Sequence, residues 1–168
     1  MNWWKDAVFY QIYPRSFQDS NGDGIGDLAG IESRLDYLAG LGVDALWISP
    51  FFKSPMKDFG YDVADYVSVD PMFGTLGDFR RLLDGAHSRG LRVVVDLVLN
   101  HTSDEHPWFR DARASRDSPK HDWYIWKPFP ERGRKQPPNN WISLFELRSA
   151  WYENPATREW YLATFTRN

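Results

Sequence analysis

Apolar residues recur along the first hundred positions in two alternating patterns. Three short runs have the apolar content of strands: Val8–Tyr13, Ala45–Ser49 and Leu91–Leu99. Between them, Leu28–Leu41 and Thr75–Arg89 repeat apolar residues every three or four positions, which predicts amphipathic helices. The last two strand runs are nearly continuously apolar, which favours strands covered on both faces. The order strand, helix, strand, helix, strand predicts a parallel sheet with right-handed crossovers.

Local signals mark the ends of both predicted helices. Thr75 and Asp78 have the spacing of a capping pair at the start of the second helix. Gly90 follows that helix, and Gly42 follows the first one, in the position of a C-terminal stop.

The links between these elements differ in length. Helix-to-strand links are short, whereas the strand-to-helix links Gln18–Asp27 and Pro50–Gly74 are long. In a β/α barrel such long loops lie at the C-terminal ends of the strands, where active sites form. The sequence therefore predicts an α/β fold, the N-terminal part of a β/α (TIM) barrel, with residues 1–99 supplying its first three βα units.

The alternation stops after residue 99. Residues 100–168 are rich in Trp, Pro, Arg and Asp and show no further βα unit, so we expect a domain B-like subdomain inserted after the third strand. Within it, Lys127–Pro138 is expected to form a solvated loop. An eight-stranded barrel needs about 200 residues or more, so we expect the chain to be truncated before a fourth strand. The alternative is an open three-stranded fragment.

Composition excludes several classes of function. The net charge is −3 and the pI is about 5.8, so nothing attracts the chain generally to nucleic acid or to an anionic membrane. The N-terminus has no apolar signal-peptide core, and no stretch approaches a membrane span. Cysteine is absent, which suits a reducing cytoplasm. Aromatic residues reach 17% with nine Trp, a surplus that sugar-binding clefts also use. The oligomeric state is left open.

The first long loop has the composition of a metal site. The predicted oxygen ligands are Asp19, Asn21, Asp23, Ile25 through its carbonyl, and Asp27. Their spacing follows the first half of an EF-hand calcium loop, but position 12 is Gly30, and a strand precedes the loop in place of a helix. An Asx- and glycine-rich turn without an ion is the alternative. Repulsion among three acids within nine residues favours the cation.

Two further groups could carry chemistry. Asp96 stands within the third apolar run, so we expect it to be charged and hydrogen-bonded to an Arg or a backbone partner. His101 follows the same strand, where a neutral imidazole can donate a hydrogen bond to a substrate hydroxyl or can cap the strand end. Asp58 and Tyr61, on the second long loop, combine a carboxylate with a ring, as sugar sites do, although Asp is also common in plain loops.

Five segments together carry a family resemblance. Val8–Phe17, Asn21–Leu28, Trp47–Pro50, Gly60–Asp62 and Asp96–Asp104 resemble, in this order, motifs of the α-amylase clan of glycoside hydrolases, most closely its oligo-1,6-glucosidase and α-glucosidase branch. The resemblance covers almost the whole chain.

The resemblance implies a function and a set of site residues. It implies a retaining α-glucosidase-like enzyme that acts on small oligosaccharides or disaccharides. Asp58 and Tyr61 would line the pocket for the terminal glucose, and His101 would hydrogen-bond the same sugar. The stretch Pro138–Trp141, with Phe145, matches a sugar-facing part of domain B. The metal would be one structural calcium or magnesium ion on the first loop.

Two departures from the family pattern stand out. Glu146–Arg148 replaces a small, glycine-containing step, which puts the shape of that loop and the role of Phe145 in question. The nucleophilic Asp, the acid/base Glu and the second stabilising Asp of the family have no counterparts here, so no catalytic residue is assigned. We expect the 168 residues alone to be inactive.

Three other functions stay open. A transglycosylase or isomerase on the same scaffold, such as a trehalose synthase or sucrose isomerase, would be distinguished by residues outside this sequence. A non-enzymatic ectodomain like the heavy chains of amino-acid transporters would carry a membrane helix. An inactive sugar- or metal-binding fragment would fold cooperatively by itself.

Overall fold

The computed structural model describes residues 2–131 and 135–165. The chain divides into two compact units, Met1–Asn100 and His101–Asn168, and each is described by itself.

Three parallel strands form the centre of the first unit. They are β1 (Phe9–Ile12), β2 (Ala45–Ile48) and β5 (Arg92–Val95), and their order in the sheet is β1-β2-β5. The pairing register joins Phe9 to Ala45 and Ala45 to Arg92, so the C-terminal ends of the strands meet at one edge. Both crossovers are helical, as the sequence predicts.

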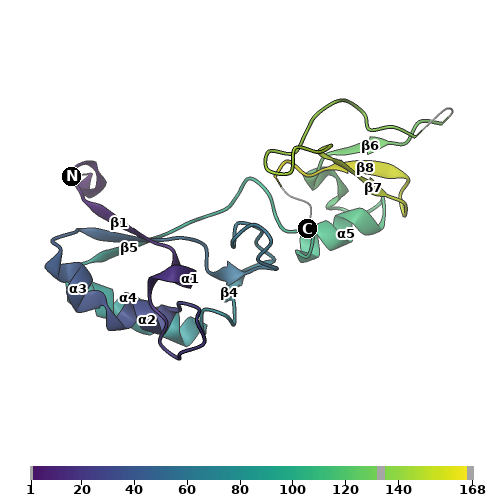
Figure 1. Cartoon of the computed structure of the whole chain (residues 1–168). Coiled ribbons are helices and arrows are strands. Elements are labelled where there is room, and N and C mark those ends of the chain that lie inside the picture. Colours follow the sequence, from purple (N-terminus) through teal and green to yellow (C-terminus); the bar gives the residue numbers. More distant parts are fainter. Residues whose placement is uncertain (1, 132–134, 166–168) are drawn as a thin grey trace. The chain divides into compact units, whose positions relative to one another are not determined.

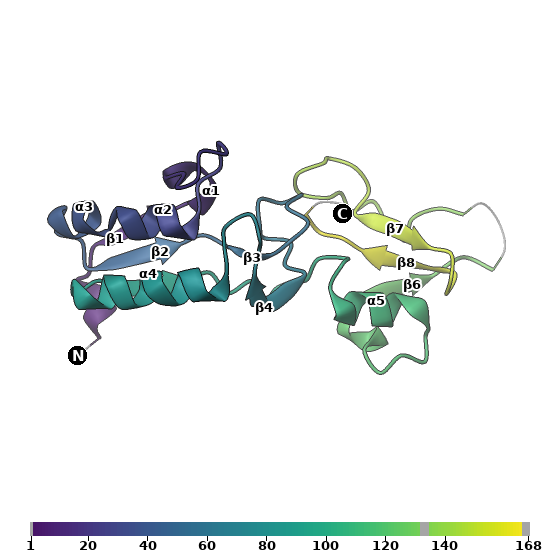
Figure 2. The ribbon, with the colours of Figure 1, turned by 90° about the horizontal axis from the view of Figure 1, so that it is seen from below.

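Four α-helices accompany this sheet: α1 (Pro14–Phe17), α2 (Leu28–Ser33), α3 (Leu35–Gly40) and α4 (Leu76–Ser88). The last three lie along one face of the strands (Figures 1 and 2). Their apolar stripes meet the sheet in a core that includes Leu38, Leu46 and Leu82. A short 3₁₀ helix, η1 (Trp3–Lys5), precedes β1.

The helix predictions hold with one difference. α4 begins with the predicted capping box, in which the Thr75 side chain accepts from the Asp78 amide while Asp78 accepts from the Thr75 backbone. The first predicted helix, Leu28–Leu41, is broken at Arg34, which ends α2 and begins α3.

The strand predictions are wrong in two respects. β5 ends at Val95 and does not continue to Leu99, because β2 ends at Ile48 and offers no further backbone to pair with. Among the described elements, helices cover one face of the sheet, and β5 is an edge strand with an exposed or half-buried pattern. The predicted coverage on both faces therefore fails for β5, whereas it agrees with β2, in which Ala45, Leu46 and Ile48 are all fully buried.

The second long link is not a simple loop. Within Pro50–Gly74 two short strands, β3 (Phe52–Lys53) and β4 (Asp65–Val69), pair antiparallel. Two residues cannot show an alternating pattern, so the sequence carries no signal for β3.

The second unit has more regular structure than its sequence suggests. It contains α5 (Pro107–Ala114), the 3₁₀ helix η2 (His121–Trp123) and an antiparallel sheet in the order β6-β8-β7. Its strands are β6 (Trp126–Pro128), β7 (Trp151–Asn154) and β8 (Glu159–Leu162). Lys127 and Pro128, predicted to lie in a solvated loop, belong to β6; residues 132–134 of that loop lie outside the described residues.

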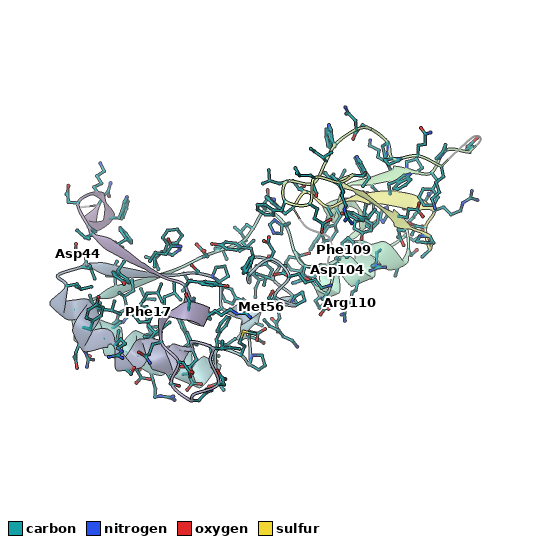
Figure 3. The ribbon with its side chains drawn as sticks, viewed as in Figure 1. Phe17, Asp44, Met56, Asp104, Phe109 and Arg110 are labelled. Carbon is teal, nitrogen blue, oxygen red and sulfur yellow. The ribbon has the colours of Figure 1, made fainter. Side chains whose placement is uncertain are left out.

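Aromatic rings form the core of this unit. Phe109, which comes from α5 (Figure 3), packs edge-on against Tyr124 and Tyr161, with ring centroids 5.0 and 5.1 Å apart. Trp126 stacks nearly parallel to the same ring at 5.9 Å. Part of the aromatic surplus noted in the composition is therefore structural.

Candidate functional site

The first long loop folds around the carboxylate of Asp19. Its Oδ1 accepts hydrogen bonds from the amides of Asn21 and Gly22 at 2.9 and 2.7 Å, and Oδ2 accepts one from Gly24 at 2.8 Å. These backbone donors, Gly24 first, hold the pKa of Asp19 below its ordinary value. Amide dipoles thus stabilise this charge, so repulsion alone does not require a cation there.

The other predicted ligands of this loop are also hydrogen-bonded. Asp23 accepts from the Ile25 amide at 2.8 Å and from the Asn21 side chain at 3.0 Å. Asp27 caps α2 by accepting from the Gly30 amide at 2.6 Å, and its second oxygen accepts from the Ser20 hydroxyl at 2.7 Å.

Oxygen atoms make up the whole predicted donor set, which matches the preference of calcium and magnesium. Across residues 2–131 and 135–165, however, no group of three or more His, Cys, Asp or Glu side chains is arranged to hold a metal. The chemistry of the donors therefore fits a hard cation, and the cation itself stays a prediction.

The second loop is shaped by a buried acid. Asp62 is 3% exposed and accepts hydrogen bonds from the Ser54 hydroxyl and the amides of Lys57 and Asp58, at 2.7, 2.9 and 3.2 Å. Gly60 has φ +98°, and a Cβ there would lie 2.9 Å from the Pro50 carbonyl, so the loop needs glycine at this position. This network fixes the backbone that presents Asp58 and Tyr61.

Tyr61 reaches the C-terminal end of the parallel sheet. Its hydroxyl donates to Asp96 Oδ2 at 2.9 Å, and its amide donates to the Asp58 carbonyl at 2.9 Å. The other oxygen of Asp96 accepts from the indole of Trp47, on β2, at 2.8 Å. The sequence prediction that Asp96 is hydrogen-bonded is confirmed, but the predicted Arg or backbone partner is wrong.

The environment of Tyr61 favours its neutral form. Burial and the hydrogen bond to Asp96, in that order, raise the pKa of Tyr61 to about 12. The phenol is 36% exposed and stays protonated at neutral pH, so it donates to Asp96 and leaves its ring available to a ligand.

The remaining predicted sugar-binding residues belong to the second unit. The ring of His101 lies 4.9 Å from that of Phe165, and Phe145 lies 5.8 Å from the same ring. Phe165 therefore brings two predicted site residues into one group. Nothing in the sequence pattern singles out Phe165, because it stands among unpatterned residues after β8.

Asp96, Trp47 and Phe165 are thus functional candidates that the sequence did not place in the site. Asp58, Tyr61, Trp47 and Asp96 are gathered in the first unit, and His101, Phe145 and Phe165 in the second. Carboxylates, a phenol, an imidazole and flat rings can bind hydroxyl groups and stack on the apolar face of a sugar.

Comparison with known proteins gives one family. The catalytic-domain model of α-amylase matches residues 11–168. A probable α-glucosidase of Rhizobium meliloti (strain 1021) is 61% identical over 164 residues, which is 98% of this chain and 29% of that protein.

Two solved structures are similar along almost the whole chain. The crystal structure of the α-glucosyl transfer enzyme XgtA is 59% identical in sequence, with a TM-score of 0.92. The match covers 98% of this chain and 30% of the XgtA chain. The crystal structure of the MutB E254Q mutant in complex with the substrate sucrose is 50% identical, with a TM-score of 0.92. That match covers 99% of this chain and 29% of the MutB chain. The chain spans about 29% of the length of the curated α-glucosidases and oligo-1,6-glucosidases that it matches.

Proposed function

Because this chain belongs to the α-amylase catalytic-domain family, we propose that it is part of a retaining α-glucosidase-type glycoside hydrolase acting on short α-glucosides. The predicted α/β fold, three parallel βα units of a barrel followed by an insertion, agrees with that membership. The activity belongs to the whole protein that carries these residues.

One observation carries the proposal beyond the family. Tyr61, three residues after Asp58 on the second long loop, donates a hydrogen bond of 2.9 Å to Asp96, which directly follows the C-terminal end of β5. In β/α barrels this edge is where substrates bind. A carboxylate beside an aromatic ring suits a glucose unit. The carboxylate accepts hydrogen bonds from vicinal hydroxyls, and the ring stacks on the apolar face of the sugar.

The residues described here would bind and orient the sugar. We assign Asp58 and His101 to its hydroxyls, Tyr61 to ring stacking and Phe145 to the neighbouring part of the substrate. Retaining hydrolysis needs two carboxyl groups about 5 Å apart on either side of the bond. No pair of acids in this chain is assigned that role, so bond cleavage is attributed to residues elsewhere in the protein.

We further propose that the first loop binds one calcium or magnesium ion. Side-chain oxygens of Asp19, Asn21, Asp23 and Asp27 and the carbonyl of Ile25 would hold it. The cation would crosslink the loop and take no part in bond cleavage. Asp27 would have to serve both the ion and the N-terminus of α2.

Transfer of glucose to another sugar is the second candidate reaction. The 59% identity to an α-glucosyl transfer enzyme favours it, and the residues that would separate transfer or isomerisation from hydrolysis are not identified in this chain. Product analysis with sucrose and with maltose distinguishes free glucose from transfer products and isomers.

A cytoplasmic location is also a proposal, and it rests on the absence of cysteine. None of the helices in the described part of the chain has the length and apolar character that crossing a bilayer requires.

The test of the proposed function uses the whole protein and p-nitrophenyl α-glucoside. We expect Asp58→Ala or His101→Ala to lower kcat/KM on the order of a hundredfold, with kcat falling as well as KM rising, because these groups hold the sugar that distorts in the transition state. Asp117→Ala, an exposed acid of the second unit, is the control. A parent protein that releases no glucose from any α-glucoside contradicts the proposal.

A further inference from the structure

Asp96 has no assigned contact with the sugar, yet both of its oxygens are hydrogen-bonded. It follows β5 directly and is half-buried. Oδ1 accepts from the Trp47 indole at 2.8 Å, and Oδ2 accepts from the Tyr61 hydroxyl at 2.9 Å. A carboxylate held by two donors has one orientation, and this orientation determines where the Tyr61 hydroxyl can lie.

The two donors come from parts of the fold with different backbone support. Trp47 is in β2 and pairs with Val94 of β5, so the parallel ladder fixes both Trp47 and the residues leading to Asp96. Tyr61 stands on a loop in which Met56 and Phe59 have φ of 58° and 53°, a conformation that L-residues adopt at some cost. Asp96 therefore ties a side chain of this loop to the sheet.

The charges around the phenol agree with this geometry. Burial is the main reason that the pKa of Tyr61 rises to about 12; the hydrogen bond and negative charge of Asp96 come next, and the Asp58 carboxylate adds to them. The Ser49 hydroxyl acts in the opposite direction. At neutral pH the phenol is the donor and the carboxylate the acceptor, which makes this a charge-assisted hydrogen bond.

We propose that Asp96, oriented by Trp47, is a positioning residue that holds the ring of Tyr61 in place for the sugar. The inference rests on the proposed function, because it assigns Tyr61 to sugar stacking. Asp96 acts through Tyr61 alone and makes no contact with the substrate. Removing the carboxylate leaves the phenol without its anchor, and the ring then samples positions that do not stack on glucose.

A double-mutant cycle in the whole protein tests this. Asp96→Asn keeps the shape of the side chain and an acceptor for Trp47, and we expect it to lower kcat/KM for p-nitrophenyl α-glucoside about tenfold or more, the scale of a hydrogen bond to a charged group. In the Tyr61→Phe background the same change should have little further effect, since the hydroxyl that Asp96 holds is already gone. Asp84→Asn, which removes one exposed charge from α4, is the matched control.

A spectroscopic measurement separates positioning from general damage to the fold. Tyrosinate absorbance is measured as a function of pH in the parent, in Tyr61→Phe, in Asp96→Asn and in the double variant. Subtracting the curve of each Tyr61→Phe protein from that of its counterpart with Tyr61 isolates the ionisation of Tyr61. We expect the ionisation of Tyr61 in Asp96→Asn to occur at lower pH than about 12, because the acceptor and its charge are lost while the burial stays.

The outcomes distinguish this inference from the proposed function. Equal losses from Asp96→Asn in both backgrounds, or an unchanged Tyr61 titration, overturn the positioning role while the glucosidase activity stands. If the parent protein hydrolyses no α-glucoside, the proposed function fails, and a shifted titration still supports the contact between Asp96 and Tyr61.

Discussion

Leu147 adopts a conformation that is unusual for its residue type. Its φ is +54°, in the left-handed region, and its side chain is 76% exposed. It lies in the segment Glu146–Arg148, where the resemblance to the α-amylase clan leads to a glycine-containing step. A left-handed backbone is strained for leucine, and the exposed side chain gains no burial energy that would offset the strain. We attribute this strain to the absence of a glycine from the segment.

Leu147→Gly is therefore expected to raise the stability of the protein. Release of the left-handed strain should raise the free energy of unfolding by about 1 kcal/mol. Part of this gain is lost because glycine increases the conformational entropy of the unfolded chain. Chemical denaturation of the parent and variant measures the difference. Leu144→Gly is the control, because Leu144 is also exposed, at 60%, but is not among the residues with positive φ. Destabilisation at both sites would contradict the strain.

At the scale of elements, α4 begins with a capping box that is recognisable from the sequence spacing of Thr75 and Asp78. Asp78 accepts from the Thr75 hydroxyl and backbone amide, and these two donors, in that order, are the main reason that its pKa lies below the ordinary value. Arg81 also pairs with Asp78 and acts in the same direction. An amphipathic helix whose N-terminal amides are satisfied by one such capping box should be sensitive to its loss.

Thr75→Ala should lower the free energy of unfolding by about 1 kcal/mol. The contribution of Asp78 depends on pH: since its folded pKa is depressed, its stabilisation is present above the ordinary value of 3.8 and is lost as pH falls through the folded pKa. Urea unfolding of the parent and Asp78→Asn across the acid range measures this. The two proteins should converge in stability at low pH, and a constant difference would exclude the linkage.

The first loop belongs to the same scale, because the proposed cation would stabilise a whole segment. Ligands that bind only the native state raise the melting temperature by mass action. We expect calcium or magnesium to raise the melting temperature of the whole protein and a chelator to lower it, with Asp23→Ala removing the response. Asp117→Ala should keep it. A chelator-insensitive parent would mean that the hydrogen bonds around Asp19 suffice to hold the loop.

At the scale of the whole molecule, the two units contain the proposed sugar-binding residues, and no pair of catalytic carboxylates is assigned among their acids. We expect an isolated polypeptide of residues 1–168 to release no glucose from p-nitrophenyl α-glucoside. Within the described residues no strand pairs with the outer edge of β5, and Leu97 and Leu99 beyond it are 64% and 78% exposed. The isolated polypeptide should therefore bind hydrophobic dyes and unfold without a sharp transition. Cooperative unfolding together with measurable hydrolysis would overturn this expectation.

The sequence by itself determined the features that depend on nearby residues. Apolar spacing gave the alternation of strands and helices, and the pair Thr75 and Asp78 gave the start of α4. The spacing of the predicted elements placed Asp58 and Tyr61 in the long link after the second predicted strand, where the structure has them between β3 and β4. These succeed because helix periodicity, capping and loop position are properties of a few consecutive residues.

Only the tertiary structure decided the features that depend on distant partners. β5 stops at Val95 because a strand extends only as far as its neighbour, and the partners of Asp96 come from positions 35 and 49 residues away. The sheet of the second unit and the grouping of His101 with Phe165 likewise arise from packing between separated segments. Such contacts leave no local periodicity, since the residues that meet in them are free to occur in any short-range pattern.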